Sequence, residues 1–249
     1  MALLEVNDLE VSLETDRVTA RTIEGISFSV ERGEVFGVVG ESGCGKSMTA
    51  LALMRLLPRN CRITSGNVRL NGTELTSRSL EDMRRVRGGE IGMIFQDSLS
   101  GLNPVMRIGD QIAESLKLHQ KLEKRAARKR VLELFDLVGI SDGKRRIDQY
   151  PHELSGGMRQ RVMIAMALAC NPSLLIADEP TTAPDVTVQL QILQLMRPLQ
   201  REIGMGILFL THNPGVRPEI PARVTVLHAR RIFPTAHDTQ LCSRATHPC

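Results

Sequence analysis

One segment constrains the fold of this chain more than any other: a glycine-rich loop at residues 40–47. Its sequence, GESGCGKS, fits the pattern G-x-x-x-x-G-K-[ST] at every position. The apolar run VFGVV at residues 35–39 precedes the loop and predicts a buried strand. Residues 47–57 follow it and predict a helix that ends before Pro58. A loop of this kind between a strand and a helix is typical of phosphate-binding sites.

The loop supplies three kinds of group that stabilise bound phosphates. Its glycines let backbone N–H groups turn toward phosphate oxygens, and the helix after it points its positive end at the same anion. Lys46 adds a full charge at the β- and γ-phosphates, and the Ser47 hydroxyl is a ligand for Mg²⁺. We therefore expect ATP to contact Gly40, Glu41, Ser42, Gly43, Cys44, Gly45, Lys46 and Ser47.

Two adjacent carboxylates follow another apolar run, in the sequence LLIADE at residues 174–179. The run predicts a short strand that ends at Asp178 and Glu179. At this strand end, we expect Asp178 to hold Mg²⁺, directly or through water. We expect Glu179 to accept a proton from the attacking water or to orient it. The pair and the loop together predict a site for ATP hydrolysis with Mg²⁺ as cofactor.

The order of the predicted elements indicates an α/β fold. Period-two alternation in the first thirty residues predicts half-buried strands, and further strands are expected at residues 35–39, 67–70, 91–95, 174–177 and 207–210. Helices are expected at residues 47–57, 108–118, 122–138, 157–170 (capped by Ser155) and 186–203. Strands that alternate with helices favour a parallel sheet, here with a helical insertion in its middle.

Composition narrows the class of protein. The chain has 249 residues, of which 42% are hydrophobic and 24% charged, as in globular domains. Its longest apolar run, residues 162–170, is far shorter than the roughly 20 residues of a membrane-spanning helix. A net charge of +4 gives no argument for nucleic-acid binding, and the 3% aromatic content argues mildly against base stacking. The five cysteines are odd in number and widely spaced, so neither a disulfide framework nor a zinc site is expected.

The segment between the two motifs resembles the signature motif of ABC ATPases. Residues 154–158 read LSGGM, where the family usually has LSGGQ. Three single residues stand where the family has other motifs: Gln96 resembles the Q-loop glutamine, Asp185 the D-loop aspartate and His212 the switch histidine. Five motifs in the family's order make the resemblance specific, and it extends over essentially the whole chain.

Four segments are similar to the ATP-binding subunits of bacterial oligopeptide, dipeptide and nickel importers. They read GESGCGKS, FQDSLSGLNP, YPHELSGGM and IADEPTT. The resemblance implies a P-loop NTPase (RecA-like) core with an N-terminal antiparallel β subdomain and an inserted α-helical subdomain. It implies one ABC-type domain over residues 1–249, with residues 1–97 and 171–249 as core and β subdomain and residues 98–170 as the helical subdomain carrying the signature.

The resemblance also implies partners and a location. In the family, ATP lies between two ATP-binding subunits, identical or paralogous, and the signature of one subunit meets the γ-phosphate bound by the other. The signature residues here are Leu154, Ser155, Gly156, Gly157 and Met158. Further partners would be two membrane permease subunits and a separate substrate-binding protein, with no nucleic acid. The chain would be peripheral, at the cytoplasmic face of the bacterial inner membrane.

Residue roles follow from the same resemblance. Glu179 would be the catalytic base, and His212 would contact the γ-phosphate. Gln96 would sense the nucleotide and would hold Mg²⁺ together with Ser47 and Asp178. ATP-driven closure of two subunits would then drive alternating access in the permease for a peptide.

Two positions near the nucleotide depart from the family pattern. The adenine base usually stacks on an aromatic side chain near the first strands, but Leu13 stands at the matching place. The aromatic residue nearby is Phe28, which lies in a strand of its own, so weak base stacking is expected. Cys44 in the loop has two interpretations, a small loop filler, which we favour, or a reactive thiol whose labelling ATP would block.

The larger departure is a cluster of prolines. Six of the twelve prolines fall between Pro184 and Pro234, and Pro198 interrupts the helix predicted at residues 186–203. Asn213 stands where the family usually has Asp, and the sequence ends at Cys249, before the longer extension such subunits carry. Besides an active importer subunit, two alternatives therefore stay open: a decayed or non-catalytic nucleotide-binding subunit, and a soluble ABC ATPase that acts on nucleic acid.

Overall fold

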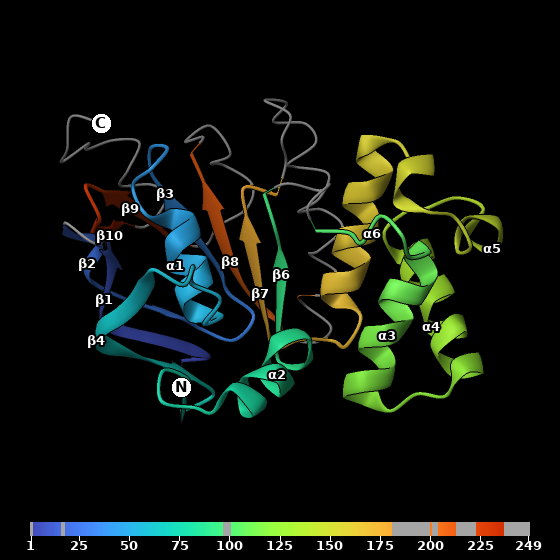
Figure 1. Cartoon of the computed structure of the whole chain (residues 1–249), viewed down its shortest axis with the longest axis horizontal. Helices are drawn as coiled ribbons and strands as arrows, with labels where there is room; N and C mark the ends of the chain where they lie inside the picture. Colours follow the sequence, from blue (N-terminus) through green and yellow to red (C-terminus); the bar gives the residue numbers. More distant parts are fainter. Residues whose placement is uncertain are drawn as a thin grey trace.

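A six-stranded, mostly parallel sheet forms the centre of the molecule. A four-stranded antiparallel sheet lies on one side of it and a group of helices on the other (Figure 1). The computed structural model describes residues 2–15, 18–96, 101–180, 200, 204–212 and 223–236. Of residues 233–236 it describes the backbone alone. This arrangement confirms the expected α/β class with an N-terminal antiparallel β region and inserted helices.

The antiparallel sheet consists of long N-terminal strands in the order β2-β1-β4-β5. These are β1 (Leu4–Glu14), β2 (Thr19–Val30), β4 (Cys61–Leu70) and β5 (Thr73–Glu74). The turn between β4 and β5 is Asn71-Gly72, with φ of 50° and 75°. Both values lie in the left-handed region that two-residue hairpin turns require, which is why this dipeptide closes the hairpin.

The central sheet has the strand order β10-β9-β3-β8-β7-β6. Its strands are β3 (Val35–Val39), β6 (Ile91–Ile94), β7 (Leu174–Asp178), β8 (Gly206–Thr211), β9 (Arg223–His228) and β10 (Arg231–Ala236). All neighbours pair in parallel except β10, which runs antiparallel to β9. The carboxyl ends of β3, β6, β7 and β8 therefore meet at one edge, where open α/β sheets bind ligands.

Alternate residues of the central strands face two separate apolar cores. Leu174 and Ile176 of β7 pack with the β1–β2 side of the molecule, whereas Leu175 and Ala177 pack with the inserted helices. Both faces are buried, which explains why these strands read as continuous apolar runs. The central sheet, whose edge carries the predicted site, is therefore packed between two apolar cores.

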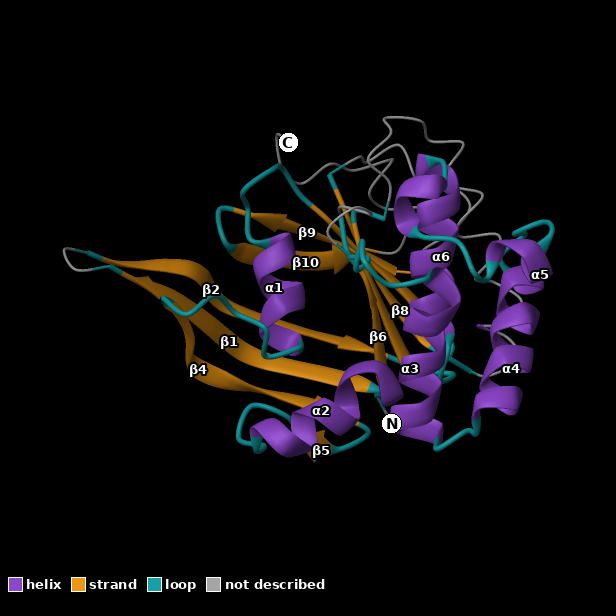
Figure 2. Cartoon of the chain, turned by 45° about the vertical axis from the view of Figure 1, so that its right-hand side comes forward, coloured by secondary structure: helices purple, strands orange, loops and turns teal. Residues whose placement is uncertain are grey.

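Two helices lie on the β-sheet side and four in the inserted region (Figure 2). The former are α1 (Lys46–Leu53) and α2 (Leu80–Gly89), and the latter are α3 (Ile108–Gln120), α4 (Lys124–Leu137), α5 (Gly143–Arg146) and α6 (Gly156–Leu168), with a short 3-10 turn at Pro151–Glu153. No helix in the described part of the chain is long and apolar enough to cross a membrane.

The structure corrects the prediction for the helix after the loop. It ends at Leu53 and not at residue 57, because Arg55 adopts a left-handed conformation with φ of 50°. The Leu56 N–H bonds the Leu51 carbonyl at 2.8 Å and the Arg55 N–H bonds the Ala52 carbonyl at 3.0 Å. These two bonds form a Schellman motif, which closes the helix before Pro58 is reached.

Sequence analysis missed α2 altogether. The sequence does contain a capping residue for α2, Ser79. Its hydroxyl accepts a hydrogen bond from the Asp82 N–H at 3.1 Å. The ends of α3, α4 and α6 lie within two residues of the predicted ones, and the short α5 was not predicted. The helix predicted at 186–203 and most of the proline cluster lie outside the described residues.

Candidate active site

The loop between β3 and α1 borders a cavity of about 270 Å³ at the edge where the parallel strands end. Its lining residues come from five separate places along the chain: Thr22, Ser42, Gly43, Gly45, Lys46, Ser47, Met48, Gln96, Glu179 and Arg230. The sheet order explains this convergence, because β6 and β7 deliver Gln96 and Glu179 to the loop that follows β3. The cavity thus unites residues that the sequence separates widely.

Glycines give the loop its shape at the two points where the chain passes most tightly. At Gly40, a Cβ atom would clash with the Leu227 carbonyl oxygen and lie 2.6 Å from the Cys44 Sγ. Gly45, the residue before α1, has φ of 112°, a value that side chains strongly disfavour. The helix then begins at once, so its free N–H groups open onto the cavity.

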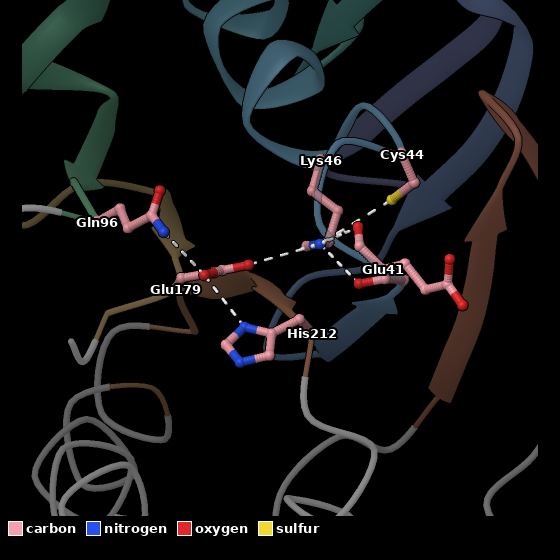
Figure 3. A network of polar contacts seen from close by, with 7 residues as sticks. Glu41, Cys44, Lys46, Gln96, Glu179 and His212 are labelled. Atoms are coloured by element: carbon pink, nitrogen blue, oxygen red, sulfur yellow. Dashed lines mark hydrogen bonds and ion pairs between the residues drawn. The ribbon is translucent and has the colours of Figure 1, made fainter. Parts of the chain in front are cut away.

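Lys46 is the charged residue at the centre of the loop. Its side chain is only 4% exposed, and its Nζ donates to the carbonyl oxygens of Gly40 at 2.6 Å and Glu41 at 2.9 Å (Figure 3). The Cys44 Sγ lies 3.9 Å from the same nitrogen. The loop therefore wraps its own lysine and holds the positive charge at the cavity floor.

Glu179 gathers three polar side chains around one carboxylate (Figure 3). Its Oε2 accepts a hydrogen bond from Gln96 Nε2 at 2.9 Å and lies 3.1 Å from His212 Nδ1. Its Oε1 lies 3.5 Å from Lys46 Nζ. Glu179 has φ of 41°, and its N–H bonds the Leu210 carbonyl of β8 at 2.9 Å, so the backbone aims the carboxylate at the loop.

Asp178 is nearly buried, at 4% exposure, and is only partly satisfied. Burial raises the pKa of its carboxyl, while a hydrogen bond from the Ser47 side chain works in the opposite direction. Its Oδ1 has no hydrogen-bond partner. An orphaned carboxylate oxygen beside a serine hydroxyl fits the oxygen-ligand chemistry of Mg²⁺. No cluster of three or more His, Cys, Asp or Glu side chains suited to a metal occurs in the described ranges.

The signature lies away from this cavity, at the start of α6. The Ser155 hydroxyl caps the helix by accepting from the Met158 N–H at 3.4 Å, as the sequence predicted, although the helix begins at Gly156. Leu154 is buried, but Ser155, Gly156 and Gly157 are exposed, and no atom lies within 4 Å of a Cβ built at Gly157. None of the signature residues lines the loop cavity.

One contact links the signature helix to the carboxylates. The Gln160 amide of α6 donates to the Pro180 carbonyl, one residue after Glu179. A movement of α6 would therefore displace the backbone at the end of β7.

Several predicted residues lie near the cavity without lining it, and one cannot be placed. Cys44 is buried and the Glu41 side chain is exposed, although the Glu41 carbonyl binds Lys46. Phe28 stacks on Phe36, with ring centroids 5.5 Å apart, and does not line the loop cavity. Asp185 lies outside the described residues.

Three lining residues were missed by sequence analysis: Thr22, Met48 and Arg230. Met48 directly follows the motif and was open to prediction from the helix start. Thr22 on β2 and Arg230 after β9 carry no motif, and only the pairing of distant strands brings them here.

Comparison with known proteins supports the family seen in the motifs. The ABC transporter family model matches residues 23–182. The probable peptide ABC transporter ATP-binding protein y4tR of Sinorhizobium fredii is 49% identical over 99% of this chain and 74% of its own length. The oligopeptide transport ATP-binding protein OppD of Bacillus subtilis is also 49% identical, over 99% of this chain and 69% of its own.

Solved structures agree on the fold. An ATP-binding cassette solved as a dimer with ADP and Pi has a TM-score of 0.83 at 24% identity and covers 94% of this chain and 98% of that one. The cbiO1 protein of Clostridium perfringens, part of the transporter complex cbiONQ, has a TM-score of 0.81 at 26% identity and covers 98% and 92%. Both confirm the P-loop NTPase fold. The chain therefore belongs to the ABC transporter family of ATP-binding proteins.

Proposed function

We propose that this protein is the ATP-binding, energy-coupling subunit of an importer for peptides. The observation that carries the proposal is the convergence of Lys46, Ser47 and Glu179 on one cavity at the sheet edge, with buried Asp178 hydrogen-bonded to Ser47 behind it. The peptide substrate is inferred from relatives named as peptide and oligopeptide transport proteins.

ATP binding would replace contacts that the loop now makes with itself. Phosphate oxygens would take the place of the Gly40 and Glu41 carbonyls at Lys46 Nζ and would weaken its pairing with Glu179. Ser47 and Asp178, with Gln96 nearby, would hold Mg²⁺. When bound, Mg²⁺ neutralises charge on the β- and γ-phosphates. The binding energy of the nucleotide would thus be used to release the catalytic carboxylate.

Hydrolysis would follow from the position of that carboxylate. The oxygen of a water molecule forms a bond to the γ-phosphorus as the bond to the β–γ bridging oxygen breaks, which leaves ADP and phosphate. Glu179 would accept the proton of the water, and His212, 57% exposed, would contact the γ-phosphate. Gln96 would couple nucleotide binding to the position of the inserted helices, because it lies between β6 and the first of them, α3.

A second subunit would complete the site. Ser155, Gly156 and Gly157 present N–H groups and a hydroxyl at the exposed start of α6, and these would meet the γ-phosphate bound by a partner. Asp185 would act at the same interface. ATP would then join the two subunits, and hydrolysis would separate them.

The remaining partners follow from the same assignment. The helical subdomain, proposed at residues 98–170 between core segments 1–97 and 171–249, would press on two membrane permease subunits. A separate binding protein would deliver the peptide. The protein would act as a peripheral subunit at the cytoplasmic face of the inner membrane, without contact with nucleic acid.

The test is ATP turnover by the purified full-length protein. Glu179→Gln should lower hydrolysis at least about 100-fold, as expected for loss of a general base. The same variant should retain ATP binding and accumulate as an ATP-dependent dimer in analytical ultracentrifugation. No turnover by the wild type would favour the non-catalytic alternative. Turnover stimulated by DNA or RNA, but not by the permease, would favour the nucleic-acid alternative.

A further inference from the structure

The wall of the cavity includes an arginine that has no role in the proposed hydrolysis. Arg230 lines the cavity together with Thr22. It belongs to the turn between β9 and β10, and its carbonyl accepts a hydrogen bond from the Glu24 N–H of β2 at 3.0 Å. The turn is therefore fixed against β2, beside the loop that carries Lys46.

The sheet order places Arg230 and Glu179 on opposite sides of the loop. β9 lies on one side of β3, whereas β8, β7 and β6 lie on the other. Glu179 and Gln96 thus border the end of the cavity where water would attack, and Arg230 borders the other end. A nucleotide with its γ-phosphate toward Glu179 and its β-phosphate at Lys46 directs its α-phosphate toward the β9 side.

The charges around Arg230 leave it available for an anion. Arg230 and Arg231 share one carboxylate, that of Glu24. Arg231 holds Glu24 at 3.1 and 3.2 Å, whereas the Arg230 pair measures 3.8 Å. Arg230 can therefore leave Glu24 without stranding a carboxylate. The three side chains together carry a surplus positive charge beside the cavity.

The backbone of this turn is unusual for the residues in it. Ala229 has φ of 47° and Arg230 has φ of 70°, so two residues with side chains occupy the left-handed region in succession. Glycine adopts that conformation at little cost, whereas other residues are disfavoured there. The two-residue hairpin between β9 and β10 requires both values, so the turn fixes the point from which the Arg230 side chain leaves the backbone beside the cavity.

We propose that Arg230 is a second nucleotide-binding cation, which leaves Glu24 and binds the α-phosphate. Lys46 then holds the β- and γ-phosphates from one side of the loop and Arg230 holds the α-phosphate from the other. This inference rests on the proposed nucleotide site. It also supplies affinity in a cavity that, among the described residues, no aromatic side chain lines.

The test compares three variants by titration calorimetry with Mg²⁺ and ATP, ADP or GTP. Arg230→Gly removes the guanidinium and suits the turn, so the fold is preserved. Arg21→Ala is the matched control, because it removes an exposed guanidinium from β2 that pairs with Glu10 and touches neither Glu24 nor the cavity. Arg230→Gly should raise Kd about tenfold for ATP, ADP and GTP alike, whereas Arg21→Ala should leave Kd within about twofold. Arg230→Lys, which keeps the charge, should lose less than Arg230→Gly.

Two results would contradict the role of Arg230 while leaving the proposed function intact. One is equal Kd values for Arg230→Gly and Arg21→Ala while the wild type binds ATP and Lys46→Ala does not. The other is a loss for ATP without a loss for GTP, which would point to the base and not to the α-phosphate. Failure of the wild type to bind ATP would contradict the proposed function, and the role of Arg230 with it.

Discussion

The chain presents two glycine-rich helix starts, and they differ in how far this chain alone encloses them. At the phosphate loop, Lys46 is 4% exposed and a Cβ at Gly40 has no room. At the signature, Gly157 has open space around it, and Ser155 faces solvent. Both helices offer free N–H groups to an anion. The phosphate loop forms a cavity with other parts of the same chain, whereas at the signature no described residue beyond its own helix comes within 4 Å of a Cβ at Gly157.

This difference shows what a second subunit would supply. The loop's glycines satisfy the geometry of their own chain, so their replacement should disturb folding. The described residues around the two signature glycines leave room for a side chain, so replacement of these glycines should disturb only assembly and turnover. The predictions that follow separate these two kinds of requirement.

The largest effect is expected from Lys46→Ala. This variant removes the buried cation that lies closest to the predicted β- and γ-phosphates, so hydrolysis should fall about 100- to 1000-fold. Steady-state phosphate release measures it. Folding should persist, because Lys46 lines the cavity, so that its truncation enlarges an existing space and leaves the loop glycines unchanged. A rate within a few-fold of the wild type would contradict the placement of ATP in this cavity.

A pair of glycine variants tests the comparison directly. Gly40→Ala should lower the free energy of unfolding by about 3 kcal/mol, since its Cβ would overlap the Leu227 carbonyl. Gly157→Ala should leave stability unchanged or slightly raised, because its Cβ meets nothing and alanine favours the helix. Urea denaturation measures both. Equal losses would erase the distinction between the two glycine-rich segments.

Asp178→Asn should stabilise the protein in the absence of Mg²⁺. The pKa of Asp178 is raised by burial, so ionisation opposes folding, and this penalty grows as pH rises from about 3.8 through the native pKa. The neutral amide avoids that penalty. At pH 8 the variant should be more stable by about 1–2 kcal/mol, and the gap should shrink as pH falls toward 4. Thermal unfolding across this range measures it, and a gap that widens at low pH would contradict the assignment.

Ser155→Ala should lower stability by less than Gly40→Ala does. Loss of the cap of α6 should cost about 1 kcal/mol, while the hydroxyl also disappears from the exposed surface. We expect ATP binding by the monomer to be unchanged and ATP-dependent dimerisation to weaken. Sedimentation with ATP in the Glu179→Gln background measures the dimer. Unchanged dimerisation would place the partner contact elsewhere.

Local sequence was sufficient for the elements that carry the motifs. The β3 strand, the loop at 40–47 and the capped start of α6 were predicted because each depends on residues within a few positions of one another. The Asn71-Gly72 turn is of the same kind. The existence of α2 was missed although its signal, the Ser79 cap, is local. The end of α1 was missed because it depends on the left-handed conformation of Arg55, which the residue type does not indicate.

The sequence by itself determined that this chain binds phosphate on a P-loop core and which carboxylates follow the facing strand. Only the tertiary structure decided that Glu179 pairs with Lys46, that Asp178 keeps an unpaired oxygen and that Arg230 reaches the cavity beside Thr22. The reason is physical. A motif is made by neighbours along the chain, whereas a site wall is made by the order in which strands pair, and β9 enters that order next to β3 from nearly two hundred residues away.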